Sequence, residues 1–548
     1  MGALKLCLAI FLFTSLCAMQ ELQAADLFRE QSKVDSAVER YGVSGKDVII
    51  AILDRGIEWQ NPDFIGPDGK TRIKWLLDMS GQNWCDPHNP RAVEYSADEI
   101  NAALAGRSVM TSRDAVGHGT VTAGIAAGNG RSLPSGIHHG VAPEADLIIV
   151  KMTSEGVPEH DVEPSEEAFN GCIGQALDWL NQKIEPVGKP VVALINSGGQ
   201  LWGPLDGTSI VSRKIEEFFG NRPGRIFVAP SGDEAGLPTH AGGNYSSSTT
   251  IVNISRSGSD PKQLEKWSQL AMWFKGPSAS IAVEFDDDHR SLTARTDVPG
   301  DQDIQNGGNE IYLHVYEPGQ EPYPTTSVGI DHFVSLEFKG HAGTGHISLR
   351  GLPVEVGRFD MYSDQAAVTE FKDHLVSGWL TDYASTKSAI VIGAYVSTNT
   401  WTDVDGNRRD ILEDVPGQLW KGSAGGPTRD GRRALDVVTP GENVFATYAS
   451  NSYWAANTSN LIQGGGSHYG WQGATSGAAP IAVGAIALML EMKPDLTSDQ
   501  VRDLLHKTAS KDGITVPIPD DNWGYGRIDV RAALDLLCSL YHSPKCPN

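Results

Sequence analysis

The sequence predicts a doubly wound parallel α/β sheet that is interrupted by an inserted all-β sandwich or jelly-roll domain. Three observations support this prediction. Runs of β-branched residues alternate with helical patterns from about residue 45 to 235, which is typical of parallel α/β sheets. Short strand-like runs then follow one another with no strong helix between most of them, and from residue 388 the alternation returns. The chain of 548 residues has room for several domains.

The first α/β part is expected to contain four buried strands and two helices. The strand-like runs are VIIAILD (48–54), ADLIIVK (145–151), VVALINSGG (191–199) and RIFVAPSG (225–232). The helical patterns are SEEAFNGCIGQALDWLNQKI (165–184) and TSIVSRKIEEFFG (208–220). Parallel sheets bind ligands beyond the carboxyl ends of their strands, so the residues that follow these runs are candidates for function.

The inserted part is expected to be built from short antiparallel strands. Its strand-like runs are TTIVNIS, QLAMWF, SIAVEF, EIYLHVYE, VSLEF, GHISLRG and RFDMYSD, and PGDQDIQNGGN (299–309) reads as a turn-rich separator. The predicted division of the chain is therefore a signal peptide (1–25), a first α/β part (26–240), the β domain (241–375) and a second α/β part with a C-terminal tail (376–548).

The second α/β part is expected to contribute two strands and two helices. The strands lie in SAIVIGAYV (388–396) and LDVVTPGENVFATY (435–448). The run IAVGAIALML (481–490) is apolar all round, which predicts a helix buried in a large domain. A last helical pattern is TSDQVRDLLHKTA (497–509).

Composition and the N-terminus limit the class of protein. The chain has 44 basic and 68 acidic side chains and a net charge of -24, which argues against nucleic acid as a partner. The stretch MGALKLCLAIFLFTSLCAMQELQAAD is typical of a cleaved secretory signal peptide, which predicts a secreted protein, extracellular or periplasmic. No later run has the uncharged length of a membrane span. In an oxidising compartment Cys538 and Cys546 are candidates for a disulfide.

Three residues in separate segments together predict nucleophilic catalysis. Asp54 ends the first strand, His118 lies between two glycines, and Ser476 precedes the buried apolar helix. Taken singly, each has a structural alternative: a turn aspartate, an inert histidine and a helix N-cap. Taken together, they supply a nucleophile, a general base and a carboxylate that orients the base, in the chain order Asp, His, Ser.

Four sequence blocks in this order resemble those of the subtilisin-like serine proteases, or subtilases. They are AILDRGIEWQNPDF, GHGTVTAGIAAG, GVAPEADLIIVK and ATSGAAPIAVGAIALML, and the resemblance covers about residues 38–240 and 376–537. It implies that Asp54, His118 and Ser476 form the triad of a serine endopeptidase acting through an acyl-enzyme. It also implies that Ser197, Gly198 and Gly199 pair with the substrate backbone. FIGPDGKTRIKWLLD and the interposed β domain further resemble bacterial subtilases with a jelly-roll insertion, such as clostridial spore-germination proteases.

The sequence departs from the family pattern at the oxyanion hole. The segment FVAPSGDEAG places Asp233 where the family has an asparagine whose amide stabilises the oxyanion. Loss of that donor costs about 100- to 1,000-fold in turnover, a figure that itself comes from subtilisin. We expect Asp233 to keep a proton during the reaction and so to favour activity at acidic pH. The alternative is that Asp233 turns away and a water molecule or another donor takes its place. Ala474 replaces a usual glycine, and Gly477 a usually larger residue.

The remaining expectations concern ligands and alternatives. The chemistry requires no cofactor, and Asp403, Asp405 and Asn407 in WTDVDGNRRD hint at a structural calcium ion, although a plain turn is favoured. The expected partners are protein or peptide substrates. The short interval before Asp54 predicts folding without a long N-terminal propeptide, or with help in trans. Two other functions stay open: a catalytically weak or inactive subtilase-fold binding protein, and a surface- or carbohydrate-binding role for the β domain.

Overall fold

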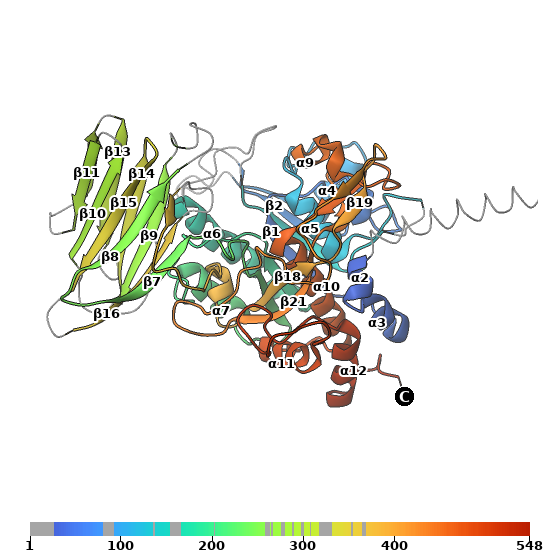
Figure 1. Cartoon of the computed structure of the whole chain (residues 1–548). Helices are drawn as coiled ribbons and strands as arrows, with labels where there is room; N and C mark the ends of the chain where they lie inside the picture. Colours follow the sequence, from blue (N-terminus) through green and yellow to red (C-terminus); the bar gives the residue numbers. More distant parts are fainter. Residues whose placement is uncertain are drawn as a thin grey trace, which may run out of the picture.

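The molecule consists of an α/β part and a β domain that lie side by side in the computed structural model (Figure 1). The structure describes residues 27–547, apart from 81–91, 135–137, 154–165, 202, 258–263, 265–266, 276–279, 288–289, 297–300, 307, 317–330, 352–354 and 364–368. The predicted signal peptide lies outside the described residues.

An eight-stranded sheet forms the centre of the α/β part. Its strand order is β21-β18-β6-β5-β1-β4-β2-β3, and of these strands only β3 runs antiparallel to its neighbour. In chain order the strands are β1 (Ile49–Asp54), β2 (Ile73–Asp78), β3 (Val93–Ser96), β4 (Asp146–Lys151), β5 (Val191–Ile195), β6 (Arg225–Pro230), β18 (Ile390–Val396) and β21 (Leu435–Glu442). In this sheet β2, β3 and β4 lie on one side of β1, and the later strands β5, β6, β18 and β21 lie on the other. The carboxyl end of β1 is therefore the topological switch point, where such sheets bind ligands.

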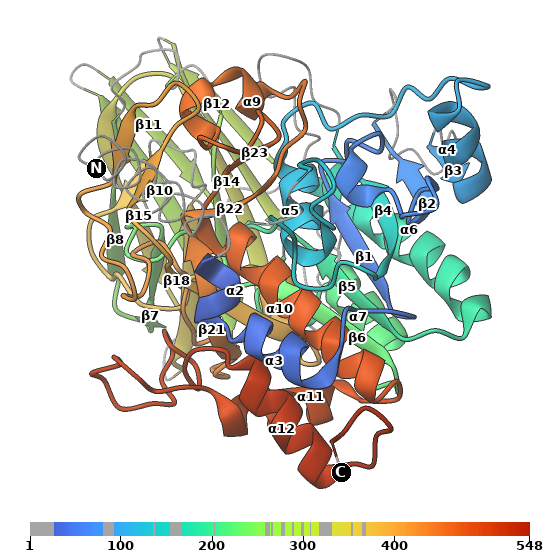
Figure 2. The ribbon, with the colours of Figure 1, turned by 90° about the vertical axis from the view of Figure 1, so that its right-hand side faces the viewer.

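Helices cover both faces of this sheet. Side chains of α2 (Leu27–Gln31), α3 (Val34–Tyr41), α5 (His118–Ala127), α10 (Ala474–Met492), α11 (Ser498–Thr508) and α12 (Val530–Leu540) share one core with one face. Figure 2 shows α10 across this face with α3 and α12 beside it. α6 (Glu166–Ile184) and α7 (Ile210–Phe219) cover the other face, and α4 (Ala97–Leu104) lies against β2 and β3.

The β domain is a sandwich of two antiparallel sheets around a single apolar core. One sheet has the order β11-β10-β15-β8-β17 and the other β12-β13-β14-β9-β16-β7. The strands are β7 (His240–Tyr245), β8 (Thr250–Arg256), β9 (Ser268–Lys275), β10 (Ser280–Asp287), β11 (Arg290–Arg295), β12 (Gln302–Asn306), β13 (Asn309–Tyr316), β14 (Asp331–Lys339), β15 (Gly343–Arg350), β16 (Gly357–Ser363) and β17 (Thr369–Phe371). The predicted fold class, a parallel α/β sheet with an inserted β domain, is confirmed.

Some predicted elements differ in detail. The separator 299–309 contains the edge strand β12, which pairs through its backbone with β13 only and has mostly exposed side chains. An edge strand of this kind needs no buried apolar face, so the pattern hides it. β5 ends at Ile195, because residues 196–199 leave the sheet toward the switch point.

The described tail contains the expected disulfide between Cys538 and Cys546. Among the described helices, α10 is long and apolar enough to cross a membrane, and 89% of its apolar window is buried inside the protein. That burial is what a core helix requires, as the sequence predicted for this run.

A buried arginine joins the two parts. Arg429, 8% exposed, donates from Nη2 to Asp206 at 2.5 Å in the α/β part and to Asp331 at 2.7 Å in the β domain. Beside these ion pairs an apolar cluster contains Leu201, Leu205, Ala271, Trp273, Phe333 and Tyr362. The β domain is thus docked through both charge and apolar packing.

Candidate active site

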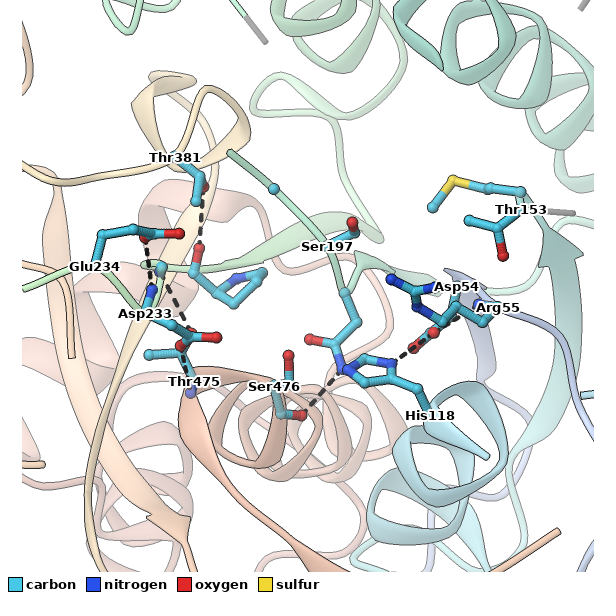
Figure 3. Close-up of a pocket in the computed structure, with 15 residues that line it drawn as sticks. Asp54, Arg55, His118, Thr153, Ser197, Asp233, Glu234, Thr381, Thr475 and Ser476 are labelled. Atoms are coloured by element: carbon cyan, nitrogen blue, oxygen red, sulfur yellow. Dashed lines mark hydrogen bonds and ion pairs between the residues drawn. The ribbon is translucent and has the colours of Figure 1, made fainter. Parts of the chain in front are cut away.

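A pocket lies at the topological switch point, beyond the carboxyl ends of β1 and β5 (Figure 3). Its empty volume, open to solvent, is about 680 Å³. Asp54, His118 and Ser476 all line it, together with Asp233. The fold therefore brings together three predicted residues that are separated by up to about 420 positions in the sequence.

Asp54 and His118 form a direct hydrogen bond. Nδ1 of His118 lies 2.7 Å from Oδ1 of Asp54, whose side chain is 1% exposed. The same carboxylate oxygen accepts a bond of 2.6 Å from the backbone N–H of Arg55. A buried aspartate on Nδ1 fixes the tautomer in which Nε2 is free to accept a proton.

The helix that carries His118 is held by a buried carboxylate that the sequence analysis did not identify. Asp114 accepts bonds from the backbone N–H of Gly117 at 2.7 Å and of Thr120 at 2.8 Å, and a third from the Thr120 hydroxyl. Burial raises the pKa of Asp114, against the lowering effect of these bonds. Gly117 has φ of +111°, so the turn into His118 favours glycine.

Ser476 lies in the first turn of α10, where two acidic side chains accept from the backbone. Glu442 accepts from the N–H of Ala474 at 2.5 Å, and Oδ1 of Asp233 accepts from the N–H of Thr475 at 3.0 Å. Carboxylates at a helix N-terminus are favoured by the helix dipole. They also fix the position of the turn that presents Ser476 to the pocket.

The two departures beside the serine have different structural consequences. Ala474 has φ of +65°, a left-handed conformation that costs a residue with a Cβ about 1–2 kcal/mol. A Cβ on Gly477 would lie 2.3 Å from the carbonyl oxygen of Gly441, so only glycine fits there. Gly477 is therefore matched to its neighbour, and Ala474 is strained.

Acidic groups surround Asp233. The Asp233 carboxyl is buried, and burial raises its pKa, while bonds from Thr475 and the nearby charge of His118 lower it. Glu234 accepts from the backbone N–H of Asp233 at 2.8 Å, and burial together with the charge of Asp233 raises the pKa of Glu234 to about 8. Burial likewise raises the pKa of Glu442 to about 7. This side of the pocket therefore holds protons more strongly than ordinary carboxylates do.

Asn196 connects the elements that carry the histidine and the serine, and the sequence analysis did not single it out. Its Nδ2 donates to the Thr122 hydroxyl at 2.8 Å and to the carbonyl oxygen of Ser476 at 3.0 Å. The Thr122 hydroxyl in turn donates to the carbonyl oxygen of His118 at 2.9 Å. One amide at the end of β5 thus links the helices that carry His118 and Ser476.

The predicted substrate-pairing segment lies at the edge of the pocket. Ser197 and Gly198 line it, and the carbonyl oxygen of Gly199 accepts from the backbone N–H of Asp382. Trp454, in the short helix α9 (Tyr453–Ala456), packs against the His118 ring with centroids 5.5 Å apart. Neither Trp454 nor Arg55, which also lines the pocket, was singled out from the sequence.

The segment WTDVDGNRRD, in which the sequence suggested a calcium ion, forms a turn between β19 (Thr400–Thr402) and β20 (Arg408–Asp410). Oδ1 of Asp403 accepts from the backbone N–H groups of Asp405 and Asn407, and Oδ2 pairs with Arg409 at 2.5 Å. Within the described part of the chain, no group of three or more His, Cys, Asp or Glu residues is arranged to hold a metal ion. The Asp403 carboxylate therefore holds this turn together through backbone and ion-pair contacts.

The chain matches the family model described as "Subtilase family" over residues 45–526. It belongs to the subtilase family. Members of this family are serine-type endopeptidases, the class predicted from the sequence.

This subtilase is similar to several known proteins. It is 38% identical to serine protease AprX of Bacillus subtilis over 90 residues, 16% of this chain and 20% of that protein. It is 22% identical to the subtilisin-like protease SBT3 of Solanum lycopersicum over 557 aligned positions, 90% of this chain and 65% of that protein. The structure resembles that of the Clostridium perfringens CspB protease with a TM-score of 0.72 and 21% identity, covering 94% of this chain and 99% of that one. That likeness supports the fold, and the match to AprX spans only a fifth of that relative.

Proposed function

We propose that this subtilase is a secreted serine endopeptidase that hydrolyses peptide bonds with Ser476 as nucleophile. The observation that carries the proposal is the Asp54–His118 hydrogen bond of 2.7 Å in the same pocket as Ser476. His118 removes the Ser476 proton as the serine attacks the peptide carbonyl carbon, and returns it to the leaving amine. Asp54 orients the imidazole and stabilises its cation. Water then hydrolyses the acyl-enzyme by the same route.

We further propose that Asp233 carries a proton when the oxyanion forms. Oδ1 of Asp233 already accepts from the N–H and the hydroxyl of Thr475, so the second oxygen is left for the pocket. Protonated, that oxygen donates to the oxyanion beside the backbone N–H of Ser476; ionised, it repels the oxyanion. Burial of Asp233 favours the protonated form. Activity is therefore expected to be higher at acidic than at alkaline pH, as long as His118 stays neutral.

The proposed substrates are proteins or peptides in an extracellular or periplasmic space. The apolar N-terminal stretch of the sequence supports export, and the disulfide suits an oxidising compartment. The pocket is open along the segment Ser197–Gly198, where an extended peptide adds as a strand. No cofactor takes part in the proposed chemistry, and the structural calcium ion remains a sequence prediction.

Labelling with a fluorophosphonate tests the proposal. An active nucleophile reacts covalently, and mass spectrometry of the labelled peptide should place the adduct on Ser476. Ser476→Ala should abolish labelling, whereas Ser197→Ala, a serine in the same pocket, should still label. Absence of the adduct in the folded wild-type protein would instead favour the alternative, a binding protein with the subtilase fold.

A further inference from the structure

Glu442 is a buried carboxylate behind the nucleophile that takes no part in the proposed chemistry. It is the last residue of β21, is 7% exposed and lies outside the lining of the pocket. Its Oε2 accepts from the backbone N–H of Ala474 at 2.5 Å, two residues before Ser476. Glu442 therefore reaches the nucleophile through the turn that it holds.

The N–H groups in the first turn of α10 are divided between two carboxylates and the pocket. Glu442 accepts from Ala474, and Asp233 accepts from Thr475 at 3.0 Å. Within the described part of the chain no acceptor takes the N–H of Ser476, so in the proposed mechanism this group is available to the oxyanion. Figure 3 shows Thr475 and Ser476 at the start of the helix, with Asp233 beside Thr475. The direction of the available N–H depends on the two bonds that precede it.

This turn needs a hold from outside the helix. Ala474 has φ of +65°, and a residue with a Cβ keeps such a conformation only where its surroundings fix it. The residue before it, Gly473, is the N-cap of α10 and has no side chain with which to cap the helix. Glu442 supplies the missing acceptor from another element. Without it, relaxation of Ala474 would turn the peptide units that follow, including that of Ser476.

The acceptor is well anchored. All residues of β21 are buried, and the carbonyl oxygen of Glu442 accepts from the backbone N–H of Ser397 at 2.8 Å. The next residue, Asn443, donates from Nδ2 to Asp414 at 3.0 Å and accepts from Nε1 of Trp471 at 2.6 Å. The Glu442 carboxyl therefore ties the start of α10 to the edge of the central sheet.

We propose that Glu442 is a positioning residue, which holds the turn at Ala474 so that the N–H and the hydroxyl of Ser476 face the substrate carbonyl. The inference rests on the proposed endopeptidase function and adds to it a residue that does not touch the substrate. Because the Ser476 N–H bonds to an oxyanion that forms during the reaction, its misdirection lowers kcat more than it changes KM.

The test compares Glu442→Ala with Glu442→Gln in peptide hydrolysis, with kcat counted per folded molecule by circular dichroism. Glu442→Ala removes the acceptor and should lower kcat by about 10- to 100-fold, with KM changed by less than about twofold. Glu442→Gln keeps an acceptor oxygen at the same reach and should stay within about threefold of the wild-type kcat. The rate of fluorophosphonate labelling at Ser476 should change in the same order.

Glu491→Ala is the matched control at the other end of α10. The Glu491 side chain is 4% exposed and accepts from the backbone N–H groups of Ser44 at 2.7 Å and Gly45 at 2.6 Å. Its loss should destabilise the protein and leave kcat per folded molecule unchanged. A carboxylate that serves the fold alone would behave as Glu491 does.

A second background tests the reason for the effect. Glycine adopts the left-handed conformation without strain, so the turn in Ala474→Gly needs less holding. In that background Glu442→Ala should lower kcat by a factor at least about threefold smaller than in the wild-type background. An equal loss in both would overturn the role given to the turn. Glu442→Gln gives a separate measurement where Glu442→Ala folds poorly.

The outcomes separate this inference from the proposed function. If the wild-type protein is labelled at Ser476 and folded Glu442→Ala keeps its kcat, the role of Glu442 is wrong while the endopeptidase function stands. A Glu442→Gln protein that is as slow as Glu442→Ala, or a change confined to KM, also overturns that role. If the wild-type protein is neither labelled nor active, the proposed function itself fails.

Discussion

The two sides of the active-site pocket differ in charge and in what they hold. On one side, the permanent cation Arg55 lies beside the Asp54–His118 pair, whose histidine is the proposed general base. On the other, Asp233 and Glu234 are buried acids with raised pKa values, and Glu442 lies behind them at the helix that carries Ser476. The difference indicates that the proposed base catalysis belongs to the first side. The expected change of activity and stability above neutral pH comes from the acids of the second side.

The largest expected effect comes from a substitution in the Asp54–His118 pair on the first side. Asp54→Asn should lower kcat/KM by about 10⁴-fold, because an amide does not hold His118 in the required tautomer. Peptide hydrolysis at several pH values measures it, with circular dichroism to show that the fold is kept. Activity within tenfold of the wild-type protein would contradict the role given to the Asp54–His118 hydrogen bond.

A change on the second side should raise activity rather than lower it. In Asp233→Asn the amide oxygen can keep both bonds from Thr475 while Nδ2 points into the pocket as a permanent donor. We expect kcat to rise by about 10- to 100-fold at alkaline pH, with little change in KM, since the new bond forms to the oxyanion. The pH–rate profile should lose its fall on the alkaline side. An unchanged profile would show that Asp233 does not govern that limb.

The acids of the second side should also make stability depend on pH. Glu234 has a folded pKa of about 8 against an ordinary 4.5, so the folded state binds more protons between these values. Its contribution to the free energy of unfolding is fully present below pH 4.5 and is lost as pH rises through about 8, a change of about 5 kcal/mol. Urea unfolding at pH 5 and pH 9, in a Ser476→Ala background that prevents self-digestion, measures this.

Glu234→Gln should flatten this dependence relative to its parent. Glu413→Gln is the matched control, because Glu413 pairs with Lys421 on the surface, where both side chains are more than half exposed. Equal slopes for the Glu234→Gln protein and its parent would show that Glu234 is not the group responsible.

The smallest expected effect concerns the turn before the serine. Ala474→Gly should stabilise the protein by about 0.5–1 kcal/mol, because relief of the left-handed strain exceeds the extra entropy of an unfolded glycine. Ala487→Gly, in the interior of the same helix, should instead destabilise it by about 1 kcal/mol or more. Thermal unfolding of both variants in the Ser476→Ala background compares them. Destabilisation by Ala474→Gly would mean that the strain is not released.

Much of the fold could be predicted because its signals are local. Short runs of apolar residues predicted the buried parallel strands and the apolar helix α10. The chain order of Asp54, His118 and Ser476 indicated the site. β12 escaped prediction because an edge strand needs no apolar pattern. α3 and α12 were not predicted either, although both are short amphipathic helices that pack together.

Several residues in and around the pocket were hidden from the sequence for a different reason. Glu442 and Asn196 act through contacts with Ala474 and Ser476, which lie 32 and 280 positions away in the sequence. No spacing rule connects such positions before the sheet order is known. Asp233 was identified only because it departs from a family pattern. Arg55 lies within the block AILDRGIEWQNPDF, but nothing in the sequence indicated that its side chain lines the pocket.

The way the β domain is inserted ties its mechanics to the pocket. The connection from β6 into β7 contains Asp233 and Glu234. The return from β17 contains Thr381, which lines the pocket and donates its backbone N–H to Ser231 at 3.0 Å. The loop that begins at Ser197 continues to Leu205, under the same domain. Three of the segments that line the pocket are therefore anchored in the sandwich. A force or a binding partner that moves the sandwich would thus move the walls of the pocket directly.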